Sequence, residues 1–352
     1  MVSVEEKLLV NVLYKEEREA LQGIDISNVN FENLMKLASN HLMLPALFFN
    51  INKKNLSHLF PEAFIECIKN IYSINKARNK ILLKEAKELS ELLYKNNINH
   101  IFLKGTALLL SNVFEDIGER MIGDIDFIIQ HKDEQKVEKV LEKNNYFMIH
   151  NIDLFSVFKP THLARRVNKN KTIAIEPHLE LLEFRNRWIF NSKELINDFK
   201  NKTKTIKTPS KIFLIDHCIL GAQIRNSGFI NSSYDHRSIY DVYKLNCEKS
   251  LIFKKKKKDI FIKHFFLTIH KFKIFDFNIV SSLSMSFTDQ LFEFASIKRY
   301  KFTQISQNYI PKFSTIIQVL FDIKLIERTL NKISIHYHHK TLLKYIYGWL
   351  KA

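Results

Sequence analysis

Residues 98–129 read INHIFLKGTALLLSNVFEDIGERMIGDIDFII, and this stretch decides the fold. An apolar run over 98–103 predicts a strand, which ends before the turn at Gly105. The leucine-rich segment 107–110 suits a helix, and a polar loop then leads to a second apolar strand over 124–129. A strand, a turn, a helix and another strand in this order predict a small α/β unit at the centre of the chain.

Two carboxylates lie at the start of the second strand. Asp124 and Asp126 are two residues apart, so on a strand their side chains share one face, while Ile125 and Phe127 share the other. Two carboxylates at the edge of a core are electrostatically costly unless a positive group binds them. A divalent metal ion is the simplest such group, so this pair predicts a metal site.

The turn between the first strand and the helix has the residues that bind a phosphate. Gly105 lets the backbone turn tightly and approach a phosphate, and the Thr106 hydroxyl and the following amides would donate to a triphosphate. Lys104 and Arg120 would offset its negative charge. Carboxylates that hold Mg²⁺ beside a phosphate-binding turn form the apparatus of phosphoryl transfer.

A third carboxylate is expected on a neighbouring strand. Glu176 ends the apolar segment 172–176, just as the two aspartates begin theirs, and would help to deprotonate an attacking hydroxyl. His178 lies two residues further on the same face, and we expect it to support a metal ligand or to contact the acceptor. Each residue alone also fits a plain structural role, such as Glu176 pairing with a lysine. Their order within an α/β unit favours the catalytic interpretation.

Two segments carry a resemblance to known families. Residues 103–108 (LKGTAL) and 120–127 (RMIGDIDF) resemble the signature of the DNA polymerase beta-like nucleotidyltransferase superfamily. More closely, they resemble the bacterial "uncharacterised nucleotidyltransferase" family, whose members read leucine-lysine-glycine, then arginine, a short spacer and Asp-hydrophobic-Asp. Residues 175–179 are similar to the Asp-Leu-His of that family, with Glu176 in place of Asp and Pro177 as a departure.

The resemblance covers roughly residues 30–245 and implies an activity. A nucleoside monophosphate would move from a nucleoside triphosphate to an acceptor, pyrophosphate would be released, and Mg²⁺ or Mn²⁺ would be the cofactor. Three residues are expected to bind metal and act in catalysis: Asp124, Asp126 and Glu176. Four residues are expected to bind the nucleotide: Lys104, Gly105, Thr106 and Arg120.

Hydrophobic periodicity divides the chain into three parts. Residues 1–95 and 186–352 have helical patterns, and 96–185 form the nucleotidyltransferase core. Within the core, residues 163–167 and 172–182 flank a polar turn and predict a β-hairpin. The expected fold class is therefore α+β, with a small mixed sheet of the polymerase beta-like type between N-terminal and C-terminal helical regions.

The composition excludes several classes of protein. The 3 cysteines among 352 residues form no CxxC pair, so a disulfide framework or a zinc site is not expected, and a reducing cytoplasm is the natural compartment. The N-terminus has acids where a signal peptide has basic residues, and no apolar run approaches the ~20 residues of a membrane span. We expect a cytoplasmic protein without stable membrane insertion, and the sequence has no signal for an oligomeric state.

The net charge of +17 supports two interpretations equally. It indicates either a polyanionic partner such as RNA or a lysine-coated surface encoded by an AT-biased genome. The lysine run 254–258 would contact RNA phosphates in the first case, although a solvated loop is favoured. The histidine cluster over 336–339 has no acidic neighbours and is also interpreted as solvated.

Three further residues have a structural interpretation. His217 lies on the apolar side of its predicted helix, so we expect a buried, hydrogen-bonded histidine. Arg237 and Asp241 are four residues apart, which is the spacing of an ion pair within a helix.

The acceptor stays open between three classes. The first is a small molecule such as a sugar, the second is the 3′ end of a tRNA, and the third is a protein side chain. The positive net charge mildly favours the tRNA. A different function is also open: a catalytically inactive module that binds a nucleotide or RNA without transfer. The Glu176-Pro177 departure favours that alternative if the third acid does not reach the metal.

Overall fold

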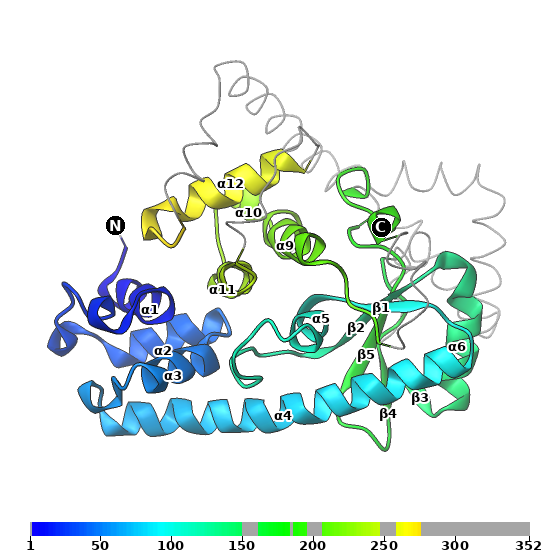
Figure 1. Ribbon diagram of the computed structural model, residues 1–352, viewed down its shortest axis with the longest axis horizontal. Coiled ribbons are helices and arrows are strands. Elements are labelled where there is room, and N and C mark those ends of the chain that lie inside the picture. The colour runs from blue at the N-terminus through cyan, green and yellow to red at the C-terminus, as the bar shows by residue number, and fades with distance from the viewer. Residues whose placement is uncertain (1, 150–160, 184–185, 196–205, 247–257, 276–352) are drawn as a thin grey trace, which may run out of the picture. The chain divides into compact units, whose positions relative to one another are not determined.

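A computed structural model describes most of the first 275 residues (Figure 1). Apart from Thr161, the described residues belong to one compact unit formed by Met1–His150 and His162–Ser284. The lysine run up to Lys257, the histidine cluster over 336–339 and the C-terminal region after residue 275 lie outside them. The described residues are 2–149, 161–183, 186–195, 206–246 and 258–275.

Helices precede the sheet, as the helical periodicity predicts. They are α1 (Val4–Tyr14), α2 (Phe31–Asn40), α3 (Leu44–Lys53) and α4 (Glu62–Lys95). The side chain of Ser3 caps α1 and that of Asn30 caps α2, each by accepting a hydrogen bond from a backbone amide in the first turn. Helix α4 is 34 residues long and runs beneath α5 and β2 in Figure 1.

The core is a five-stranded mixed sheet in the order β1-β2-β5-β4-β3. Its strands are β1 (His100–Phe102), β2 (Asp124–Ile129), β3 (Tyr146–Met148), β4 (Arg166–Asn168) and β5 (Ala174–His178). Strand β2 pairs antiparallel with β1 and parallel with β5. The predicted hairpin is confirmed by the antiparallel pair of β4 and β5, although both strands are shorter than expected. The expected α+β class is therefore correct.

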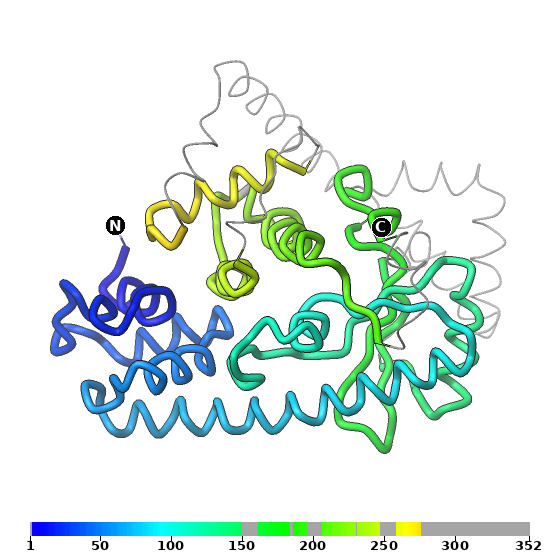
Figure 2. The backbone as a smooth tube through the Cα atoms, in the orientation of Figure 1, coloured from blue at the N-terminus to red at the C-terminus, as the bar shows by residue number. Residues whose placement is uncertain are grey.

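Helices on both sides of α5 hold the centre of the unit. Helix α5 (Lys104–Leu110) contacts α4, β2 and α9 (Lys211–Leu220). The other described helices are α6 (Glu134–Lys143), the π-helical turn Gly221–Arg225, α10 (Gly228–Asn231), α11 (His236–Lys244), α12 (Asp259–Ile269) and short 3-10 turns at Glu17–Glu19, Ile26–Asn28, Ser57–Leu59, His131–Asp133, Ser192–Leu195 and His270–Phe272. Figure 2 shows the backbone leaving α5, looping out and returning into β2.

Asparagines of α4 fix the loop between α5 and β2. Asn75 donates to the carbonyl oxygens of Gly118 and Arg120 at 2.8 and 3.1 Å. Asn79 donates to those of Ile117 and Arg120 at 2.6 and 2.7 Å. Backbone carbonyls of a buried loop need such donors, because an unpaired polar group away from water is costly. The loop is thereby held in one conformation as it enters β2.

None of the helices in the described ranges, the long α4 included, has the length and apolar character needed to cross a membrane.

Candidate active site

Three side chains of types that can ligate a metal converge across strands β2 and β5. In the parallel pairing, Asp126 lies opposite Glu176 and Ile128 lies opposite His178. The Nε2 atom of His178 is 2.8 Å from Asp126 Oδ1 and 3.1 Å from Glu176 Oε2. One ligand atom from each of the three side chains lies within 4.8 Å of the other two. The donor set of two carboxylates and an imidazole suits a divalent cation.

Lys104 supplies the positive charge of this cluster in the structure. Its Nζ atom is 2.7 Å from Asp126 Oδ1, 3.4 Å from Glu176 Oε2 and 3.3 Å from His178 Nε2. Lys104 has a positive φ of 50°, which costs a non-glycine residue about 1–2 kcal/mol. The backbone turn into α5 therefore includes a strained residue whose ammonium group contacts both carboxylates.

The three carboxylates have different electrostatic environments. Burial raises the pKa of Asp126, but the hydrogen bond from His178 and the charge of Lys104 outweigh burial and hold that pKa well below its usual range. Glu176 has the same balance, and its pKa is also lowered. Asp124 differs, because burial and then the charges of Asp126 and Glu176 raise its pKa.

Asp124 is therefore the carboxylate with the weakest compensation. Its Oδ2 atom is 3.5 Å from the guanidinium of Arg165, and burial with the repulsion from the other two acids outweighs the attraction of Lys104 and Arg165. A half-buried carboxylate with a raised pKa beside two others indicates a place where a further cation would be stabilising. The chemistry of the cluster thus fits a divalent metal ion.

The backbone conformation of the turn at Gly105 differs from the one that the sequence predicted. The residue with the positive φ is Lys104, so the expectation that Gly105 provides the freedom for the tight turn is wrong. A Cβ atom on Gly105 would lie 2.8 Å from Cγ1 of Ile122, so the glycine is needed for the close approach of the loop. The buried Thr106 hydroxyl donates to the carbonyl oxygen of Asp124 at 3.2 Å and joins α5 to β2.

Arg120 is buried and forms an ion pair with Asp241 of α11, which is distant in the sequence. Its Nε and Nη2 atoms donate to the two carboxylate oxygens of Asp241 at 2.7 and 2.8 Å. The prediction of an ion pair between Arg237 and Asp241 is wrong, because Asp241 forms its ion pair with Arg120. The Nε atom of Arg237 is 4.0 Å from Asp235. The Arg120–Asp241 pair therefore attaches the loop before β2 to α11.

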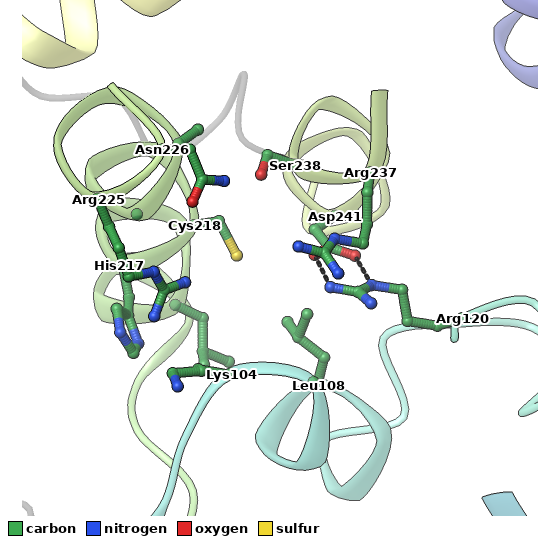
Figure 3. A pocket seen from close by; sticks show the side chains of 14 residues that line it. Lys104, Leu108, Arg120, His217, Cys218, Arg225, Asn226, Arg237, Ser238 and Asp241 are labelled. Carbon is green, nitrogen blue, oxygen red and sulfur yellow. Dashed lines mark hydrogen bonds and ion pairs between the residues drawn. The ribbon is translucent and has the colours of Figure 1, made fainter. Parts of the chain in front are cut away.

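A basic cleft adjoins the acidic cluster at Lys104 (Figure 3). The cleft encloses about 460 Å³, including solvent space at its mouth, between α5, α9 with its π-helical turn, and α11. Its charged lining consists of Lys104, Arg120, Arg225, Arg237 and Asp241. The single carboxylate of that lining is the one that Arg120 binds on both oxygens. The cleft is thus strongly positive.

His217 also lines the cleft and is buried, as predicted. Its ring packs against Phe190 and Phe213. The sequence also predicted a hydrogen bond, but His217 forms none with another described residue. Burial, followed by the charges of Arg225 and Lys104, lowers its pKa to about 3, so the imidazole is neutral at pH 7.

Arg225 and Arg237 were not among the residues that the sequence assigned to the site. Their sequence signal is weak: two arginines flank the segment 226–236, which is rich in Asn and Ser. Local periodicity does not determine that two arginines from separate helices face each other. Only the packing of α9 against α11 brings them to one cleft.

One comparison with known proteins gives a match. A family model described as "Uncharacterised nucleotidyltransferase" matches residues 27–252. No curated protein and no solved structure matches the chain. The matched segment includes the acidic cluster and every charged residue of the basic cleft.

Proposed function

Since this chain belongs to the uncharacterised nucleotidyltransferase family, we propose that it transfers a nucleoside monophosphate from a nucleoside triphosphate to a hydroxyl-bearing acceptor. Pyrophosphate is the second product. Membership of the family supports a transfer that uses a nucleoside triphosphate. The single observation that carries the finer proposal is the register of β2 on β5, in which Asp126 lies opposite Glu176.

In this proposal Asp126 and Glu176 of the cluster would hold the metal together with Asp124, which lies outside the cluster, and the ion is Mg²⁺ or Mn²⁺. His178, the third member of the cluster, would be a further ligand or orient the two acids. When bound, the cation supplies positive charge to the phosphates and lowers the pKa of the acceptor hydroxyl. Glu176 is the more exposed of the two facing acids, with 17% of its side chain accessible against 4% for Asp126. The accessible carboxylate suits the acceptance of the proton from an attacking hydroxyl.

Lys104 has two partners in this account. Its ammonium compensates Asp126 and Glu176 in the structure, where the distances are 2.7 and 3.4 Å. A divalent cation between these acids would repel the ammonium, and Lys104 also lines the basic cleft. We propose that Lys104 would exchange its contacts with the acids for contacts with the phosphates of the nucleotide. A lysine is suited to this exchange, because its stem is flexible and its charge is compact.

The other residues that the sequence assigned to nucleotide binding shape the turn and the loop around the site. Arg120 lines the cleft, but its guanidinium is compensated by Asp241, so it holds the loop rather than the nucleotide. Gly105 keeps the start of α5 against Ile122, and Thr106 ties α5 to β2. These contacts support a role in shaping the phosphate-binding turn.

The alternative is a module that binds a nucleotide or RNA without transfer. The Glu176-Pro177 departure was the sequence feature in its favour, on the condition that the third acid does not reach the metal. In the structure Pro177 lies within β5, its carbonyl accepts from Leu163 at 2.7 Å, and Glu176 remains in register with Asp126. This observation favours the enzyme over the module.

Labelled nucleotides test the proposal and identify the acceptor class. The purified protein is incubated with each α-labelled nucleoside triphosphate, Mg²⁺ or Mn²⁺, and a cell extract. We expect labelled product and pyrophosphate. Sensitivity of the product to ribonuclease identifies tRNA, sensitivity to protease identifies a protein, and resistance to both identifies a small molecule such as a sugar. Nucleotide binding with no transfer for any nucleotide would favour the module.

A further inference from the structure

We propose that Arg225 and Arg237 clamp the phosphate chain of the nucleoside triphosphate from opposite walls of the basic cleft. Arg225 ends the π-helical turn that follows α9, and Arg237 lies in the first turn of α11. Figure 3 shows both guanidinium groups directed into the space between these helices, above Lys104 and Leu108. The inference rests on the proposed function, because it names the residues that hold the same nucleotide.

These two arginines differ from the other cations of the cleft because neither forms a close ion pair with a carboxylate. Arg120 is bound on two oxygens by Asp241, and Lys104 contacts Asp126. Arg225 has no ion pair with any carboxylate in the described ranges. Its guanidinium lies against Gly221, on which a Cβ atom would be 3.4 Å from Arg225 Nη2. One guanidinium in this wall is therefore available to a ligand.

Arg237 is only weakly compensated. The nearest carboxylate oxygen belongs to Asp235 and is 4.0 Å from its Nε atom. Asp235 is already engaged as the cap of α11, where it accepts from the amide and the hydroxyl of Ser238 at 3.0 and 2.5 Å. Burial, then the charge of Arg120, lowers the pKa of Arg237. The cations of the cleft thus repel one another, and a polyanion would relieve this repulsion.

The local backbone supports a ligand-binding role for the Arg225 wall. Residues Gly221–Arg225 form a π-helical turn directly after α9. Such turns are rare and occur frequently at functional sites, because the wider turn changes the direction of the following side chains. Here the turn brings Ala222 and Arg225 to the same cleft as Cys218 of α9.

The chemistry of the pair selects a chain of phosphates. A guanidinium is a planar fork that donates two parallel hydrogen bonds to a phosphate, so two opposed forks suit two phosphate groups. The side chain of Asn226 lines the same space and supplies a neutral donor, whereas the hydroxyl of Ser238 already donates to Asp235. We expect the cleft to prefer a triphosphate over a diphosphate, and a diphosphate over a monophosphate.

Inorganic triphosphate is the probe that tests the clamp without transfer. Its affinity for the full chain is measured by calorimetry in metal-free buffer at fixed ionic strength. We expect Arg225→Gln and Arg237→Gln each to weaken binding by about tenfold or more, and Arg237→Lys to weaken it less. Lys211→Gln is the control, because Lys211 is exposed at the start of α9 and is not part of the cleft lining. Circular dichroism verifies that each variant is folded.

The clamp is overturned if Arg225→Gln and Arg237→Gln both bind triphosphate with the affinity of the wild type. Stronger competition by an RNA oligonucleotide without a triphosphate end than by a nucleoside triphosphate would also overturn it, because the cleft would then bind an RNA backbone. Asp126→Asn distinguishes the two proposals. It removes a carboxylate of the acidic cluster, so transfer is lost while triphosphate binding to the arginines persists.

Discussion

Asp126 on β2 lies directly opposite Glu176 on the parallel neighbour β5, and His178 Nε2 lies within 3.1 Å of both carboxylates. Fifty residues separate the two acids in the sequence, yet a single strand pairing brings them together. The pairing also determines where Lys104 and the basic cleft lie relative to the acids, because Lys104 contacts both acids and lines the cleft.

Metal binding is expected to stabilise the folded chain. A ligand that binds only the native state at about 100 times its Kd raises the free energy of unfolding by about 2.7 kcal/mol. Mn²⁺ or Mg²⁺ should therefore raise the unfolding temperature of the wild type. Asp126→Asn should abolish this increase, whereas Glu91→Gln, an exposed carboxylate of α4, should retain it. An equal increase in Asp126→Asn would contradict the assigned ligand.

Asp124 should destabilise the metal-free protein at neutral pH. Its folded-state pKa lies above its usual value, first because of burial and then because of the charges of Asp126 and Glu176. The folded state therefore loses stability as pH rises through that pKa. We expect Asp124→Asn to increase the free energy of unfolding at pH 7, and the gain to shrink as pH falls toward the ordinary aspartate pKa of about 3.9.

Urea denaturation at pH 7 and at pH 4 measures that difference. The same substitution should decrease stability in the presence of saturating Mn²⁺, because a ligand is lost. A gain in stability that is equal at both pH values would show that the charge of Asp124 is not responsible.

The buried pair of Arg120 and Asp241 should matter for stability. Removal of one partner leaves an uncompensated buried charge, which costs about 3–5 kcal/mol. We expect this loss for Arg120→Met and for Asp241→Asn, measured by chemical denaturation. The exposed pair of Glu32 and Lys36 provides the comparison, and Glu32→Gln should leave the unfolding midpoint unchanged. Equal effects in the buried and exposed pairs would contradict the structure of the loop.

Gly105 should be intolerant of a side chain. A Cβ atom there would lie 2.8 Å from Ile122 Cγ1, so Gly105→Ala forces the loop away and should cost about 1–3 kcal/mol. In Ile122→Ala the contact disappears, and adding Gly105→Ala should then cost much less. A double-mutant cycle by chemical denaturation measures this coupling, and additive effects would exclude the contact.

Local pattern explains why part of the structure was predictable. An apolar run predicted the strand over 124–129, which the structure confirms, and a carboxylate at the end of another apolar run predicted that Glu176 lies near the two aspartates. The hairpin of β4 and β5 was predicted from a polar turn between two apolar runs, because neighbouring antiparallel strands need only a short connection.

The remaining features depend on contacts between distant residues. Arg120 and Asp241 are 121 positions apart, and the spacing of Asp241 to Arg237 within one helix favoured the wrong partner. The positive φ of Lys104 has no sequence signal, because glycine stands beside it and is the usual residue for a tight turn. Packing of α9 and α11 determines which arginines face the cleft, and no local periodicity encodes that packing.

The central claim is that the acids of β2 and β5 transfer a nucleotide. The most direct measurement is the rate of label transfer from an α-labelled nucleoside triphosphate, with Mg²⁺ or Mn²⁺, for the wild type, Asp126→Asn and the control Glu91→Gln. We expect the rate to fall about 100-fold or more in Asp126→Asn, which corresponds to about 2.7 kcal/mol in the activation barrier, and to stay unchanged in the control. Transfer by Asp126→Asn at the wild-type rate would contradict it.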